Sequence, residues 1–119
     1  MEQFDEVLKL VNQARAILGC APIPALPQGY TCSAFYCPIA RALKCESSPR
    51  VGVHEDMILF GPGEYDHAKQ VAEAWGTSFT EKETAHVGVP PPPALADFIH
   101  RFDNREFPQL IAYDPFEKD

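Results

Sequence analysis

Four cysteines lie within 26 residues of this 119-residue chain, at Cys20, Cys32, Cys37 and Cys45. Thiolates are the ligands of tetrahedral zinc sites and of iron–sulfur clusters, and the spacing C-x11-C-x4-C-x7-C gathers enough of them for one centre. The pattern contains no C-x-x-C pair, which is the usual local clamp of such sites. A zinc or iron–sulfur centre on these four residues is therefore the alternative interpretation. We favour reduced cysteines that pack as small hydrophobic side chains, and expect disulfides least because the cytosol keeps thiols reduced.

Cys37 is a second candidate for chemistry because it directly precedes a predicted helix. The N–H groups and the dipole at a helix start can lower the pKa of a thiol. A nucleophile also needs a base within hydrogen-bond reach, and the candidates are His54, His67, His86 and His100. The plainer interpretation is that Cys37 caps or packs at the helix start. A cysteine-dependent enzyme is thus the third hypothesis, and we assign no catalytic residue.

Several functional motifs are absent from the sequence. The histidines form no H-E-x-x-H arrangement, and the GPG at 61–63 lacks the lysine and the serine or threonine of a phosphate-binding loop. A possible helix-turn-helix at IARALKCESSPRV fails because Pro49 and Gly52 fall inside the would-be recognition helix. Zinc hydrolysis, nucleotide hydrolysis and helix-turn-helix recognition of DNA therefore have no support in the sequence.

The charge distribution favours a protein partner. The formal net charge is −7, and the halves differ: residues 1–50 hold five basic and four acidic side chains, whereas residues 51–119 hold five and thirteen. An acidic surface repels phosphate backbones, so we expect no nucleic-acid partner, and tight binding through the acidic half would require a basic protein surface. The sequence has no apolar run long enough for a membrane span. Its first residues are acidic, whereas a secretory signal would begin with basic residues, so we expect a cytoplasmic protein.

Apolar side chains at three- and four-residue spacing predict three amphipathic helices, at 4–18, 64–75 and 94–102. A short helix should begin at Pro38, where a missing N–H costs nothing. Val51–Val53 and Met57–Phe60 should form a β-hairpin. The inward stripes give a predicted core of Leu8, Val11, Leu43, Val71, Trp75, Phe98 and Phe102.

The remaining segments are predicted from their prolines and short apolar runs. Residues 20–36 should form an ordered loop, because alternating prolines fit neither a helix nor a central strand. Pro90–Pro93 should stiffen the lead-in to the last helix, with docking of an exposed polyproline stretch as the alternative. A strand at His86–Val89 is left open, and the tail should dock as a final turn. Together these elements predict one α+β domain, helix-dominated, over residues 1–119.

Three sequence blocks, ARAILGCAPIPALPQG, CPIARAL and FIHRFDNREFPQL, carry a family resemblance. In these blocks the chain resembles small uncharacterised proteins of actinobacteria and their phages, and the resemblance covers most of its length. It implies no active site, but it implies a phage or prophage accessory protein that binds a cellular protein. The function predicted from the sequence is therefore a small cytosolic, non-enzymatic protein-interaction or regulatory protein.

Overall fold

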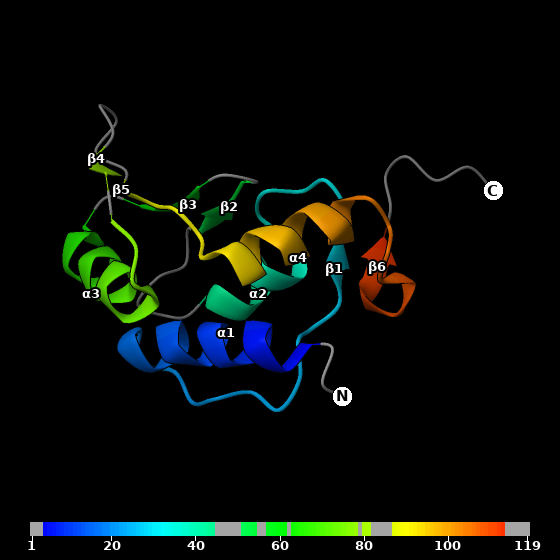
Figure 1. Ribbon diagram of the computed structural model, residues 1–119, viewed down its shortest axis with the longest axis horizontal. Coiled ribbons are helices and arrows are strands. Elements are labelled where there is room, and N and C mark those ends of the chain that lie inside the picture. Colours follow the sequence, from blue (N-terminus) through cyan, green and yellow to red (C-terminus); the bar gives the residue numbers. More distant parts are fainter. Residues whose placement is uncertain are drawn as a thin grey trace.

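The structure is a computed structural model and describes residues 4–44, 51–54, 57–61, 63–78, 80–81 and 87–113. It is an α+β fold, as predicted, with a Cα radius of gyration of 13.6 Å. In the described part of the chain the helices pack beside two small sheets (Figure 1). The α-helices are α1 (Asp5–Ile17), α2 (Pro38–Leu43), α3 (Tyr65–Trp75) and α4 (Pro93–Asp103).

These helices begin and end where local sequence signals place them. Gly19 and Gly76 follow α1 and α3 with φ of +82° and +73°, a conformation that glycine adopts without strain. Pro92 is buried and extended, and Pro93 is the first residue of α4. The proline tract thus leads into the helix, which agrees with the interpretation favoured from the sequence.

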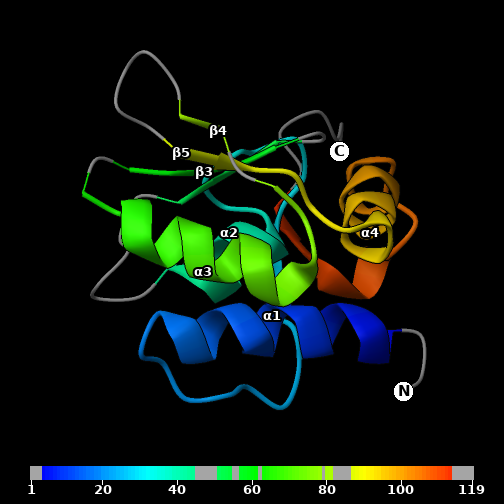
Figure 2. The ribbon, with the colours of Figure 1, turned by 60° about the vertical axis from the view of Figure 1, so that its left-hand side comes forward.

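The larger sheet has four antiparallel strands in the order β2-β3-β5-β4. The predicted hairpin is present as β2 and β3. The strand at 86–89, which the sequence left open, is present as β5 over Val87–Val89, and His86 lies outside the described residues. Figure 2 shows α3 lying between this sheet and α1. The strands are β2 (Gly52–Val53), β3 (Ile58–Phe60), β4 (Thr80–Glu81) and β5 (Val87–Val89).

The second sheet was not predicted. β1 (Gly29–Tyr30) pairs in parallel with β6 (Ile111–Tyr113), which follows a short 3₁₀ turn at Pro108–Leu110. β1 lies within the segment 20–36, which was expected to be an ordered loop without a strand. The tail docks through a turn at Pro108–Leu110, as predicted, but it then continues as β6. A two-residue strand has no readable period, and its partner lies about eighty residues away in the chain, so only tertiary contacts define it.

A close backbone approach joins β1 to the start of α2. A side-chain carbon added at Gly29 would meet the Pro38 nitrogen and the Cys37 carbonyl carbon closer than 3.0 Å. Only glycine allows the two segments to lie this near each other, because any Cβ would overlap backbone atoms that cannot move aside. The N-terminus of α2 is thereby placed against the small sheet.

The core is close to the prediction. Of the seven residues expected inside, six are buried and Leu8 is partly buried. The Trp75 indole is also anchored by a hydrogen bond, because its Nε1 donates to the carbonyl of Leu10 at 2.8 Å and so ties α3 to α1. Within the described residues, no helix is long and apolar enough to cross a lipid bilayer.

Candidate functional site

The segment of residues 31–37, which we call the cysteine loop, is held on two sides by backbone hydrogen bonds. Tyr30 N–H donates to Tyr36 O at 2.7 Å, which closes the loop at its base. Val53 N–H donates to Ala34 O at 2.7 Å, which attaches the loop to β2. These contacts explain how a segment without a helix or strand of its own keeps a defined shape.

A third hydrogen bond ties the cysteine loop to α4. The backbone N–H of Cys32 donates to Oδ1 of Asp103, the last residue of α4, at 2.9 Å. Cys32 has φ of +54°, which is uncommon for a residue other than glycine. The carboxylate therefore stabilises a loop conformation that its own sequence does not favour.

A cavity of about 250 Å³ lies between the cysteine loop, the end of β2 and the C-terminal half of α4. Figure 1 shows the loop, in cyan, arching between these elements. One part of the lining is apolar and another carries a hydroxyl, an imidazole, a carboxylate and two thiols. The lining residues are Cys32, Ser33, Ala34, Cys37, Val53, His54, Ile99 and Asp103.

The two thiols of this cavity have different environments. Cys32 is exposed, whereas Cys37 is buried, with 5% of its surface accessible. Cys37 is the N-cap of α2, and its Sγ accepts a hydrogen bond from the backbone N–H of Ala40 at 3.4 Å. Burial nevertheless raises the pKa of Cys37 from its ordinary 9.0 to about 11, since desolvation outweighs the backbone hydrogen bonds that lower it.

The effect predicted for the start of α2 is thus reversed at Cys37. The sequence suggested that the helix terminus would activate this thiol, but the buried side chain stays protonated at neutral pH. Cys37 caps the N-terminus of α2 and packs in the core, as the plainer interpretation held. No local pattern distinguishes Cys32 from the other cysteines, because its exposure depends on the fold of the cysteine loop.

The four cysteines do not share one chemical state. Cys20 is disulfide-bonded, which contradicts the expectation of reduced thiols there, whereas Cys32 and Cys37 are reduced. Cys45 lies outside the described residues. A sulfur in a disulfide has no thiolate to give a metal, so in this state Cys20 is not available for the alternative zinc or iron–sulfur set. Among the residues whose placement is described, no group of three or more cysteine, histidine or acidic side chains could hold a metal ion.

The candidate histidines are dispersed. His54 lines the cavity with the two thiols. His67 Nδ1 lies 2.9 Å from Glu64 Oε1 at the start of α3, and His100 Nε2 lies 3.2 Å from Asn104 Nδ2 on α4. His86 lies outside the described residues. Among the described histidines, His54 therefore shares a cavity lining with Cys32 and Cys37.

Three large aromatic side chains emerge around the same loop. Tyr30, Phe35 and Tyr36 expose 39%, 51% and 52% of their surface. The rings of Tyr30 and Tyr36 are 5.5 Å apart, and the Lys44 ammonium lies 4.3 Å from the centre of the Tyr36 ring. We call Tyr30, Phe35, Tyr36 and Lys44 the aromatic surface. This surface was not predicted, although the run YTCSAFY follows a proline-rich loop and loops lie at the protein surface.

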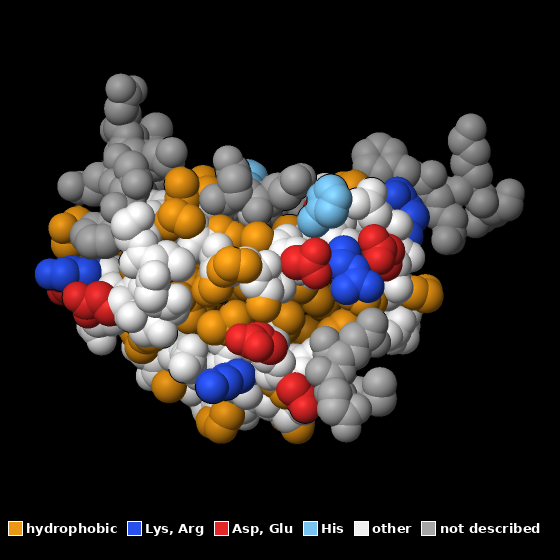
Figure 3. Space-filling model, in the orientation of Figure 1, with side chains coloured by type: hydrophobic (Ala, Val, Ile, Leu, Met, Phe, Trp, Pro, Cys, Tyr) orange, Lys and Arg blue, Asp and Glu red, His pale blue; other side chains and the backbone are white. Residues whose placement is uncertain are grey.

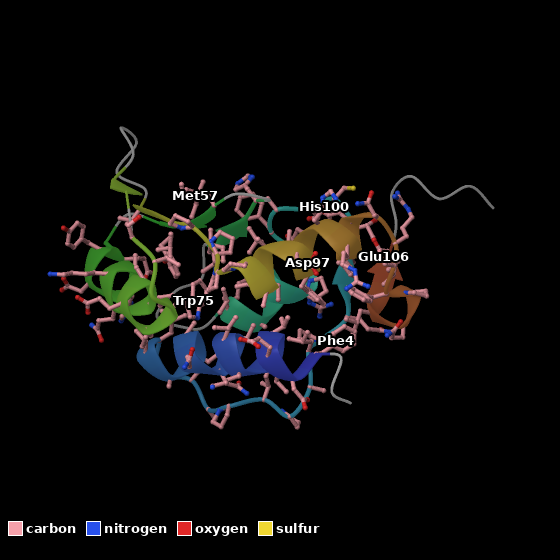
Figure 4. All side chains as sticks on the ribbon, in the orientation of Figure 1. Phe4, Met57, Trp75, Asp97, His100 and Glu106 are labelled. Carbon is pink, nitrogen blue, oxygen red and sulfur yellow. The ribbon has the colours of Figure 1, made fainter. Side chains whose placement is uncertain are left out.

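Two acidic side chains of residues 51–119 are paired with an arginine on α4. Asp97 and Glu106 flank Arg101, with N···O distances of 3.6 and 2.9 Å (Figure 4). This row crosses α4, above apolar side chains that gather between α4 and α1 on the face of Figure 3. Two further acids of residues 51–119 cannot be placed in this way, because the side chain of Glu81 is not described and Glu83 lies outside the described residues.

Comparisons with protein-family models, with curated proteins and with solved structures found no match to this chain. The resemblance to actinobacterial and phage proteins therefore stays a prediction.

Proposed function

We propose that this chain is a protein-binding module and that the aromatic surface is its contact site. The observation that carries this proposal is the exposure of Tyr30, at the end of β1, and of Phe35 and Tyr36, on the adjoining cysteine loop. Aromatic side chains are enriched at protein interfaces, where they bury a large area at a small cost in conformational entropy. Burial of these three rings against a second protein would add that stabilisation.

The chemistry of the surface favours an acidic partner segment. Lys44, the C-cap of α2, lies over the Tyr36 ring. The exposed Arg41 is on α2, and its Nη1 donates to the carbonyl of Gln28 at 2.8 Å. These cations lie in the half of the chain that has no acidic excess. Aromatic rings beside cations also suit single-stranded nucleic acid, but the net charge of −7 opposes a phosphate backbone. We therefore propose a protein, which in a phage or prophage setting would be a host protein.

Site-specific crosslinking in the source cell tests this function. A photoreactive amino acid is placed at Tyr36, and in a matched control at Tyr65, which is 42% exposed on α3. We expect one protein adduct from position 36 that is absent from position 65. The double variant Phe35→Ala and Tyr36→Ala should lose this partner, and Lys44→Glu should weaken it, while Tyr65→Ala retains it.

Two results would reject the proposal. One is an adduct that forms equally from positions 36 and 65, because it would not depend on the aromatic surface. The other is an oligonucleotide adduct at position 36, which would identify the surface as a stacking platform for nucleic acid. Thermal unfolding of each variant is the control, because a variant that loses the adduct but keeps the melting temperature of the wild type is still folded.

The location that we propose is the cytoplasm, and the disulfide of Cys20 provides a test. Thiols in that compartment are kept reduced, so rapid acid quenching and thiol labelling of intact cells should find Cys20 reduced there. A Cys20 that stays oxidised in the cell would instead place the protein in an oxidising compartment.

A further inference from the structure

We propose that the cavity beneath the cysteine loop is a thiol–disulfide exchange site, in which Cys32 attacks a small-molecule disulfide and Cys37 resolves the mixed disulfide. This activity is separate from the protein binding proposed above, since it depends on the cavity and not on the exposed rings. The starting observation is that two reduced thiols, one exposed and one buried, line the same cavity with an imidazole.

The surroundings assign the first step to Cys32. Its side chain is exposed at a cavity that also contains His54, whose imidazole can accept the thiol proton. Asp103 acts as a positioning residue, because its carboxylate holds the Cys32 backbone N–H and with it the loop conformation. Cys37 cannot make the first attack on a dissolved disulfide, because only 5% of its surface is accessible.

The cavity suits a small disulfide better than a protein one. Its volume of about 250 Å³ holds a few heavy atoms on each side of a sulfur pair. Ala34, Val53 and Ile99 offer apolar contact to the carbons beside the sulfurs, and Ser33 offers a hydroxyl to a polar substituent. The substrate class is therefore a low-molecular-weight disulfide, R–S–S–R.

The exchange balances in two steps. The Cys32 thiolate attacks one substrate sulfur, forming a Cys32–SR bond, while the substrate S–S bond breaks and the departing thiolate takes the proton held by His54. The Cys37 thiolate then attacks Sγ of Cys32, forming a Cys32–Cys37 bond and releasing the second RSH with the Cys37 proton. The substrate gains two electrons and the two cysteines lose two. A dithiol reductant returns the protein to its starting state by the reverse exchange.

The raised pKa of the Cys37 thiol is compatible with this second role. At pH 7 a thiol with a pKa of about 11 is ionised in about one molecule in ten thousand. The second step is intramolecular, however, and well-oriented groups within one molecule can act as if present at about 10⁵ M. Cys37 is thus inert toward solutes, yet it can react with a sulfur held in the same cavity.

Bis(2-hydroxyethyl) disulfide, whose two substituents are small enough for the cavity, is the probe added to the folded full-length protein. The products are mapped by peptide mass spectrometry and by counting released thiol. The wild type should form a Cys32–Cys37 disulfide and release two molecules of 2-mercaptoethanol. The variant Cys37→Ser keeps an N-cap oxygen and should stop at a 2-mercaptoethanol adduct on Cys32 with one thiol released. Cys32→Ser should release none from this site, and His54→Gln should slow the first step about tenfold or more.

Three outcomes would overturn the proposal. A stable 2-mercaptoethanol adduct on Cys32 in the wild type would show that Cys37 does not resolve it. A reaction of Cys32 no faster than in the urea-unfolded protein would show that the cavity contributes nothing. An unchanged rate in His54→Gln would remove the base from the site. Because the aromatic-surface variants leave both thiols in place, failure of this activity and failure of protein binding are separately observable.

Discussion

The carboxylate of Asp103 accepts a hydrogen bond from the backbone N–H of Cys32 at 2.9 Å, across 71 residues of chain. This contact joins the end of α4 to a loop residue with a positive φ, and both residues line the cavity. The last turn of one helix therefore helps to set the shape of the cysteine loop.

Asp103→Ala should lower the free energy of unfolding by about 1 kcal/mol, because a partly exposed hydrogen bond to a charged acceptor is lost. It should also speed amide hydrogen exchange at Cys32. Asp103→Asn keeps an acceptor oxygen and should retain most of both properties. Equal exchange rates at Cys32 in all three proteins would contradict the role given to this contact.

Cys37 should make stability depend on pH in the alkaline range. Its pKa is about 11 in the folded protein and ordinarily 9.0, so the folded state keeps the proton to higher pH than the unfolded state. The associated stability is fully present below pH 9 and is lost as pH rises through 11, which amounts to about 2 to 3 kcal/mol. Denaturant unfolding of the wild type and of Cys37→Ser at pH 8 and 11 isolates this loss, since tyrosine and lysine titrate in both. Parallel losses in the two proteins would show that Cys37 is not responsible.

Gly29→Ala should destabilise the protein by about 2 kcal/mol or more, because the new Cβ would overlap backbone atoms of Cys37 and Pro38. Gly88→Ala is the matched control. The atoms nearest to its Cβ would belong to the flexible side chains of Met57 and Leu59, so the cost should stay below about 1 kcal/mol. Chemical denaturation compares the two, and an equal cost would mean that β1 can move away from α2.

Phe98→Ala should cost about 3 to 5 kcal/mol if the cavity that it leaves cannot collapse. The Phe98 ring is 3% exposed and lies within 6.2 Å of the rings of Phe4, Phe102 and Phe107, measured between ring centres. Phe35→Ala, at a ring that is 51% exposed, should change stability by no more than about 0.5 kcal/mol. A loss below about 1 kcal/mol for Phe98→Ala would show that the inner face of α4 is misassigned.

Local sequence determined the helices and the hairpin of this protein. Side chains three and four residues apart meet on one face of a helix whatever surrounds it, so the stripes of α1, α3 and α4 could be predicted before any fold was known. Pro38 and Pro93 sit at the first positions of α2 and α4 because a proline there loses no hydrogen bond. Leu8 is only partly buried because the width of each buried face depends on the neighbouring elements.

Tertiary structure alone decided the small parallel sheet, the state of the cysteines and the cavity. Gly29 pairs with Ile111 across most of the chain, and cysteine spacing does not specify which thiols are oxidised. The sequence pointed to Cys37 because a helix start can activate a thiol, whereas its burial makes that thiol harder to ionise. Cys32, His54 and Asp103 come from a loop, a strand end and a helix end. Their meeting depends on long-range packing, which no periodicity or local propensity encodes.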